Sequence, residues 1–145
     1  MPLVSITRFR ARAFWFVPLF AFHAQRSISQ IRNAKGCLAL ALLKDKKRTF
    51  WTMTMWTDER SRKSYMTSAC HRKAMPRLAD WGDEASVVHW HQNQPERPDW
   101  LEAARRMRAE GRPSKLRHAG PRHADLSFPE PWTTVDNLFE TFPAD

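Results

Sequence analysis

A chain of 145 residues is long enough for one domain with a hydrophobic core and too short for two independent domains. Its 24 lysines and arginines outnumber its 15 acidic residues, which gives a net charge of +9. The cations form no dense tract, so they favour a generally basic surface over a specific nucleic-acid site. Cys37 and Cys70 are too far apart for a CxxC zinc or redox site, and they predict buried thiols in a reducing compartment.

The first segment predicts a strand followed by a helix. Leu3–Arg10 is rich in apolar and β-branched residues, as expected of a strand. Phe14–Ala34 predicts a helix, because apolar residues recur at three- and four-residue steps and Gly36 follows as a stop. The apolar run Ala13–Ala24 resembles part of a signal peptide. However, it contains Pro18 and His23 and is shorter than the ~20 residues of a membrane-spanning helix. We therefore expect a cytoplasmic protein, with export as the alternative.

A second apolar stripe runs along the same helix and is offset from the first. It consists of Trp15, Leu19 and Phe22. A helix that is apolar on two faces needs two partners. The stripe predicts contact with a neighbouring subunit, and the alternatives are a ligand cavity or a peripheral membrane surface.

The middle of the chain predicts a β-hairpin followed by a helix. Cys37–Leu43 is a short apolar run, and Thr49–Trp56 alternates with a period of two on the other side of a charged loop. A helix begins near Glu59 after a cap at Asp58, and Pro76 ends or kinks it.

A further strand is predicted over Glu84–Gln92. His89 and His91 share one face of it, with their Cβ atoms about 7 Å apart by strand rise. Two imidazoles at this separation can share a metal ion, but the nearby sequence offers no third ligand. The pair therefore predicts a polar pocket wall or a dimer contact, and we expect no metal site.

The elements occur in the order strand–helix–strand–strand–helix–strand. This order predicts an α+β fold, a ferredoxin-like βαββαβ antiparallel sheet with two helices on one face. The other face would be uncovered, and dimerisation face to face as an α/β barrel would bury it. We assign residues 1–94 to this domain. Residues 95–145 would add a C-terminal helix between Asp99 and Gly111 and a proline-rich extended tail.

The order of elements, Trp56 at the end of the third strand and the helix sequence SACHRKAMPRL resemble the dimeric α/β-barrel superfamily. This superfamily includes antibiotic biosynthesis monooxygenases and small haem-degrading oxygenases. RAFWFVP together with SACHRKAM also resembles the spheroidene monooxygenase-like group, whose members are haem-dependent carotenoid oxygenases. The resemblance covers roughly residues 1–92. The haem-degrading branch has an asparagine in its first strand, where this chain has Ser5 and Thr7, and Met75 stands about where that branch has a helical histidine.

The candidate site residues lie mainly on the third strand and the second predicted helix. His71 is the first candidate, as a general base or as an axial haem ligand. The adjacent Arg72 would disfavour the imidazolium form and is expected at the cofactor. Trp56 and Tyr65 are expected beside His71 in the catalytic pocket, and His23 is a second cofactor contact. The alternatives are structural helix histidines and an aromatic residue of the core.

These patterns predict a small monooxygenase-like enzyme that acts on a hydrophobic small molecule. We expect a homodimer, without a cofactor or with haem, that has no specific nucleic-acid partner. Dinucleotide-binding, P-loop, nucleophile-elbow, zincin and EF-hand motifs do not occur. The alternative is a non-catalytic binding module on the same scaffold, whose arginine-rich face meets an acidic partner.

Overall fold

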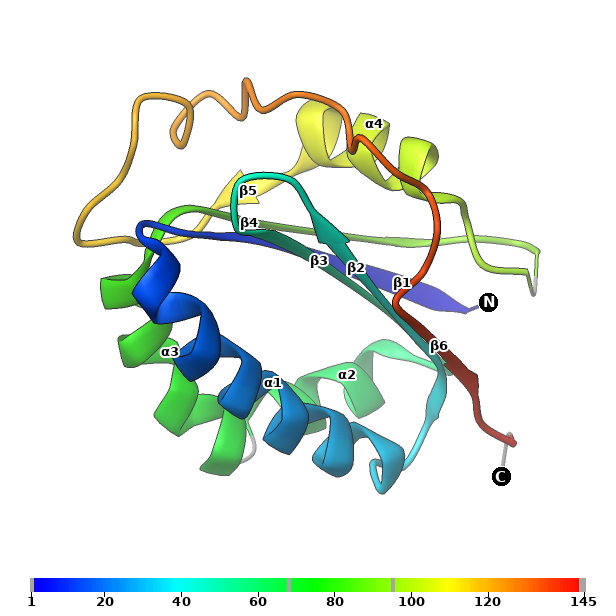
Figure 1. Ribbon diagram of the computed structural model, residues 1–145. Helices are drawn as coiled ribbons and strands as arrows, with labels where there is room; N and C mark the ends of the chain where they lie inside the picture. The colour runs from blue at the N-terminus through cyan, green and yellow to red at the C-terminus, as the bar shows by residue number, and fades with distance from the viewer. Residues whose placement is uncertain (1, 68, 95, 144–145) are drawn as a thin grey trace.

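The protein folds into three layers, with one antiparallel sheet between two covering layers (Figure 1). The computed structural model describes residues 2–67, 69–94 and 96–143, apart from the side chains of residues 69–74. The sheet is built mainly from β1 (Leu3–Ala11), β2 (Cys37–Asp45), β3 (Thr49–Trp56) and β4 (Gly82–His91). Two short strands, β5 (Arg112–Pro113) and β6 (Leu138–Thr141), complete it at its edges. Across the described residues the strand order is β5-β4-β1-β3-β2-β6, and every neighbouring pair is antiparallel.

The central order β4-β1-β3-β2 is that of a ferredoxin-like βαββαβ unit, so the predicted fold class is confirmed. The predicted hairpin is also present, since β2 pairs directly with β3. Lys47 and Arg48 turn it, both in the left-handed region with φ of 57° and 62°.

Three helices cover one face of the sheet. The 3-10 turn η1 (Phe14–Phe16) leads into α1 (Val17–Arg32), whose first turn contains Pro18, where a missing N–H costs no hydrogen bond. The helix predicted from Glu59 is divided into α2 (Glu59–Met66) and α3 (Ala69–Trp81). Thr67 is the C-cap residue of α2, and its hydroxyl lies within hydrogen-bond distance of the carbonyls of Lys63 and Ser64. The prediction that Pro76 ends the helix is wrong, since α3 contains this proline and continues to Trp81, and a kink at Pro76 stays a prediction.

The other face of the sheet is covered by α4 (Trp100–Glu110) and by the segment after it. The carboxylate of Asp99 caps α4 by accepting the N–H of Glu102 at 2.8 Å. The apolar residues of α4 recur at helical spacing and are buried against the strands: Trp100, Ala103, Ala104 and Met107. The expectation of an uncovered face is therefore wrong, because the chain's own C-terminal part occupies it. A homodimer stays a prediction, and its interface would have to lie elsewhere.

The segment after α4 crosses from one edge of the sheet to the other. It pairs with β4 through β5 and with β2 through β6, which lie at opposite edges. Midway, His123 accepts the N–H of Ala85 at its Nδ1 and donates from Nε2 to the carbonyl of Ser114. In this segment Leu138 and Phe142 pack against the apolar core. Trp132 and Phe139 are exposed, and each ring lies under a cation, Lys46 over Trp132 and Arg97 over Phe139.

Candidate functional site

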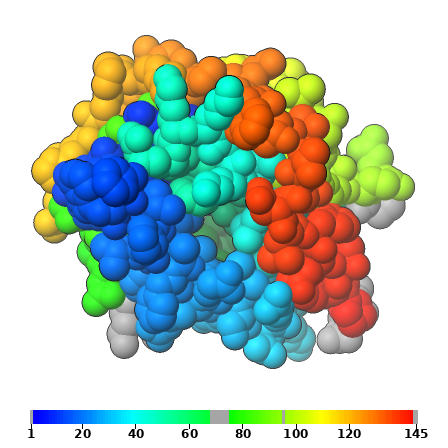
Figure 2. Space-filling model, viewed as in Figure 1, coloured from blue at the N-terminus to red at the C-terminus, as the bar shows by residue number. Residues whose placement is uncertain are grey.

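The two faces of the central sheet are packed very differently. Toward α4 the strands carry buried side chains: Val4, Ile6, Ala39, Ala41, Leu43, Trp51, Met53, Met55, Val88 and Trp90. On the face toward α1, α2 and α3, Thr7 is solvent-exposed in the middle of β1, although β4 and β3 flank it on both sides. Its cross-strand neighbours Thr52 and Val87 are half-buried. The helices therefore do not close on the sheet, and Figure 2 shows a recess between α1 (blue) and β2 and β3 (cyan).

The strand register determines the floor of this recess. One row across β4, β1 and β3 consists of His89, Ser5 and Thr54, and the next row consists of Val87, Thr7 and Thr52. Hydroxyl groups thus line two central strands beside one imidazole. The rows beyond them are mostly apolar, with Leu3 and Trp56 beside the exposed His91 at one end and with Phe9, Phe50 and Ala85 at the other. A few polar groups between apolar ends are typical of a small-molecule site.

His89 is the titratable group of this floor. It is half-buried, and burial lowers the pKa of its imidazole below the ordinary value, as does the nearby Arg62, while Glu59 opposes the shift. Arg62 and Glu59 belong to α2 and form an ion pair at 2.6 Å. The imidazole is therefore neutral near pH 7 and available to accept a proton. His91 lies two residues on at the exposed end of β4, and no group of metal-binding side chains occurs among the described residues.

The side chains of Trp56 and Tyr65 contact each other, since Trp56 ends β3 and Tyr65 lies on α2, the helix that follows this strand. Their ring centroids are 5.5 Å apart. Trp56 is only 1% exposed, and its indole N–H donates to the hydroxyl of Thr54 at 2.9 Å. This indole is thus a core group that orients one hydroxyl of the floor. Tyr65 is half-buried and also lines a groove of about 570 Å³ between α1 and α2.

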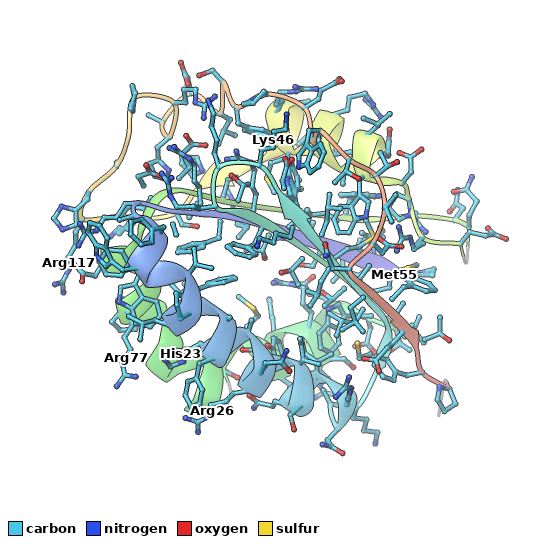
Figure 3. All side chains as sticks on the ribbon, viewed as in Figure 1. His23, Arg26, Lys46, Met55, Arg77 and Arg117 are labelled. Carbon is cyan, nitrogen blue, oxygen red and sulfur yellow. The ribbon has the colours of Figure 1, made fainter. Side chains whose placement is uncertain are left out.

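His23 lies in the seam between α1 and α3. Its ring centroid is 5.3 Å from that of Trp81, and its Nε2 is 3.3 Å from a guanidinium nitrogen of Arg77. Burial lowers the pKa of His23, and the charges of Arg77 and Arg26 lower it further. Figure 3 shows His23, Arg26 and Arg77 close together on the helical side of the molecule. None of the described contacts of His23 involves the hydroxyl rows of the floor.

The backbone of His71 and Arg72 lies in α3, and their side chains are outside the described residues, so their predicted roles stay predictions. The side chain of Cys70 is also outside them. Cys37 is buried as expected, and burial raises the pKa of its thiol to about 11, which makes it an inert core group.

The sequence analysis did not single out the threonines of the floor or the Glu59–Arg62 pair. A signal for the threonines exists in β3, where Thr52 and Thr54 alternate with Trp51, Met53 and Met55. This alternation places hydroxyls on one face and large apolar groups on the other. Which face is covered more loosely depends on the helices, and the strand pattern does not contain that information.

A family model described as a domain of unknown function (DUF3291) matches residues 11–139. The chain belongs to this family. The match includes α4 and nearly all of the segment that follows it from one edge of the sheet to the other, residues 111–141, which we call the edge-to-edge segment. Both therefore belong to the region that is common to the family. No curated protein sequence matches this DUF3291 protein. Among the described residues, no helix has the length and apolar character needed to cross a membrane.

Several solved structures of small proteins are similar to this DUF3291 protein. SnoaB, a cofactor-independent oxygenase from Streptomyces nogalater, has 16% identity and a TM-score of 0.55, with 66% of this chain and 98% of that chain covered. An antibiotic biosynthesis monooxygenase has 16% identity and a TM-score of 0.57, with 63% and 99% covered. A conserved protein from Methanosarcina mazei Go1 has 14% identity and a TM-score of 0.59, with 64% and 94% covered.

These likenesses show that the fold of this chain is shared with antibiotic biosynthesis monooxygenase-like proteins. The chain covers nearly all of each of those proteins, whereas about a third of this chain has no counterpart in them. We infer that the βαββαβ unit from Leu3 to His91 makes up most of the shared part, because the chain's coverage is close to the length of this unit. We infer that α4 and the segment after it lie outside the part shared with these structures.

Proposed function

We propose that this protein is a small oxygenase-like enzyme that holds a hydrophobic substrate in the recess between the sheet and α1–α3, with His89 as its general base. The observation that carries the proposal is a half-buried imidazole, whose pKa burial and Arg62 lower, beside hydroxyl groups and between mostly apolar rows of the sheet. The names of two proteins with this fold, an antibiotic biosynthesis monooxygenase and a cofactor-independent oxygenase, support the reaction class.

The chemistry requires a substrate with an acidic C–H, such as a CH2 group between aromatic rings or beside a carbonyl. His89 accepts one proton from this carbon, and the carbanion spreads its charge onto an oxygen that accepts hydrogen bonds from Ser5 or Thr7. The carbanion then supplies the electrons that reduce dioxygen, the one co-reactant. A C–O bond forms, the imidazolium returns its proton to the peroxide, and loss of water leaves a carbonyl. In balance, one CH2 group and one O2 give one C=O group and one water.

The haem-dependent alternative needs an axial ligand in the recess. His23 stays a predicted cofactor contact, and at present its Nε2 lies 3.3 Å from the guanidinium of Arg77 and its ring packs against Trp81. His71 remains the predicted ligand for that alternative, and no step is derived through haem.

Oxygen uptake tests the proposal. Purified protein is mixed in air with a tricyclic aromatic ketone that has an activated CH2 group, and oxygen consumption is followed with an electrode. His89→Gln should lower kcat about 10²-fold or more, whereas His91→Gln, on the same strand face, should have wild-type activity. Activity should also fall as the pH drops through the pKa of His89, because the imidazolium cannot accept a proton.

Haemin titration separates the alternatives. A Soret band that appears with haemin and is lost in His71→Ala, together with activity only in the haem-loaded protein, would contradict a cofactor-independent mechanism. Tight binding of the aromatic ketone without oxygen uptake would instead support the non-catalytic binding module.

A further inference from the structure

The outer surface of η1 and α1 exposes large apolar side chains. The exposed fractions are 73% for Phe14, 59% for Trp15, 46% for Leu19 and 61% for Phe22. Steps of four and three residues place the last three on one stripe of the helix surface. We call these four residues the apolar patch. Figure 2 shows η1 and the start of α1 (dark blue) projecting from the surface of the molecule.

Two cationic side chains lie next to the apolar patch. Arg26 stands one helical turn beyond Phe22, and its guanidinium carbon is 5.9 Å from the centroid of that ring. Arg77 of α3 reaches the same surface, beside His23 on α1. Neither η1 nor α1 contains an acidic residue, and the first acidic residue of the whole chain is Asp45.

We propose that the apolar patch docks the protein on an anionic membrane surface. The aromatic rings and Leu19 would enter the boundary between headgroups and acyl chains, and Arg26 and Arg77 would contact lipid phosphates and carboxylates. A basic helix with an exposed apolar stripe lies in the plane of such an interface.

A second copy of the chain is a poorer occupant of this surface. Two copies packed through the apolar patch would add Arg26 and Arg77 of both protomers to one contact surface, and neither η1 nor α1 offers a carboxylate to pair with them. Asp80, an acidic residue of α3, faces His118 at 3.4 Å. An anionic lipid surface supplies the negative charge that this part of the protein lacks.

Docking would lay α1 along the lipid surface. The recess opens beside this helix (Figure 2), so its mouth would be close to the membrane. A hydrophobic substrate dissolved in the bilayer would then have a short path to the floor of the recess. This substrate route rests on the proposed function, whereas the docking itself does not.

Co-sedimentation with lipid vesicles tests the docking without any substrate. The protein should bind vesicles of phosphatidylcholine and phosphatidylserine more tightly than vesicles of phosphatidylcholine alone, and high salt should weaken the binding. Trp15→Ser combined with Phe22→Ser should lower the partition coefficient about tenfold or more, because two interfacial aromatic rings are lost. Arg26→Gln combined with Arg77→Gln should lower it about fivefold or more on the mixed vesicles.

Matched variants control for general effects. Trp132→Ser removes a tryptophan that is 60% exposed, almost the same as Trp15, but lies on the edge-to-edge segment. Arg105→Gln removes an exposed cation of α4. Both should bind like the wild type. Equal binding by the apolar-patch variant and the wild type, or equal binding to both vesicle types, would overturn the proposal. So would light scattering that shows a wild-type dimer dissociated by the Trp15 and Phe22 substitutions.

Discussion

The guanidinium of Arg8 and the carboxylate of Glu84 are joined by a 2.6 Å ion pair inside the protein, with side chains only 4% and 3% exposed. Arg8 also lies over the ring of Phe128, 4.3 Å from its centroid, and Arg122 contacts the second oxygen of Glu84 at 3.1 Å. Arg8 and Glu84 belong to the sheet, whereas Phe128 and Arg122 belong to the segment after α4. This buried charge cluster therefore fastens that segment to the strands.

Replacing Glu84 should destabilise the protein strongly. In Glu84→Gln the guanidinium of Arg8 would stay buried without a counter-charge, which costs about 3–5 kcal/mol in the free energy of unfolding. Urea denaturation at pH 7 measures this change. The control is Glu130→Gln, whose side chain is 63% exposed in its pair with Arg108, and it should change stability by less than about 1 kcal/mol. Equal effects of the two substitutions would contradict a buried cluster.

The same pair predicts a pH dependence. Burial alone would raise the pKa of Glu84, but the contacts with Arg8, Arg122 and Arg10 outweigh it and lower the pKa below the ordinary value of 4.5. The ion pair is therefore fully present above pH 4.5 and is lost as the pH falls through the folded-state pKa. Stability measured by urea denaturation should fall in acid for the wild type and fall less steeply for Glu84→Gln. Parallel curves for the two proteins would argue against this linkage.

Truncating side chains of α4 should show how much the sheet face that this helix covers contributes to the free energy of unfolding. Trp100 is completely buried, so Trp100→Ala should lower the free energy of unfolding by about 3–5 kcal/mol. The next residue, Leu101, is 46% exposed, and Leu101→Ala should cost less than about 1 kcal/mol. Thermal unfolding of the two variants tests the contrast. A tolerated Trp100→Ala would mean that α4 does not close this face in solution.

The titration of His89 can be followed by two-dimensional NMR of its ring protons. Because burial and Arg62 lower its pKa, the midpoint should lie below 6.5. Arg62→Gln should raise the midpoint, since it removes a cation and frees the carboxylate of Glu59. A midpoint for His89 above 6.5 would remove the basis for a neutral general base on the floor of the recess.

Gly36 is predicted to be required at the junction of α1 and β2. Its φ of 88° is in the left-handed region, and a methyl group there would lie 2.6 Å from the Cβ of Ser61 on α2. Gly36→Ala should therefore cost about 1–3 kcal/mol in thermal or urea unfolding. Gly120→Ala is the matched control, because its nearest contact would be an ordinary 3.4 Å. Similar stability of both variants would argue against close packing of α2 on this turn.

The fold was largely predictable because its signals are local. The alternation of Thr49–Trp56 predicts both the strand and the separation of its two faces, and the cap at Asp99 predicts the start of α4. The division of α2 from α3 is not predictable in this way. The hydroxyl of Thr67 contacts carbonyls of the preceding turn, and every helical stretch offers such carbonyls, so the sequence contains no distinctive signal for the end of α2.

Two features are not predictable from local signals: which sheet face α4 covers, and the recess between the sheet and α1–α3. The stripe from Trp100 to Met107 predicts an amphipathic helix, but a helical period does not say which surface the helix will meet. The exposure of Thr7 depends on how far three helices stand from the sheet, which side chains distant in sequence determine. The contact between Trp56 and Tyr65 is a local one, because they belong to a strand and the helix that directly follows it, and their catalytic role stays a prediction.

The segment that joins the two edges of the sheet also has a consequence for folding during synthesis. β2 can form its hairpin with β3 early, but among the described residues its outer edge is paired by β6, whose residues are translated much later. While the ribosome is still translating the part between them, β2 presents unpaired N–H and C=O groups beside an apolar sheet face that α4 has not yet covered. The nascent chain is therefore open to strand-to-strand association until residues 138–141 have emerged.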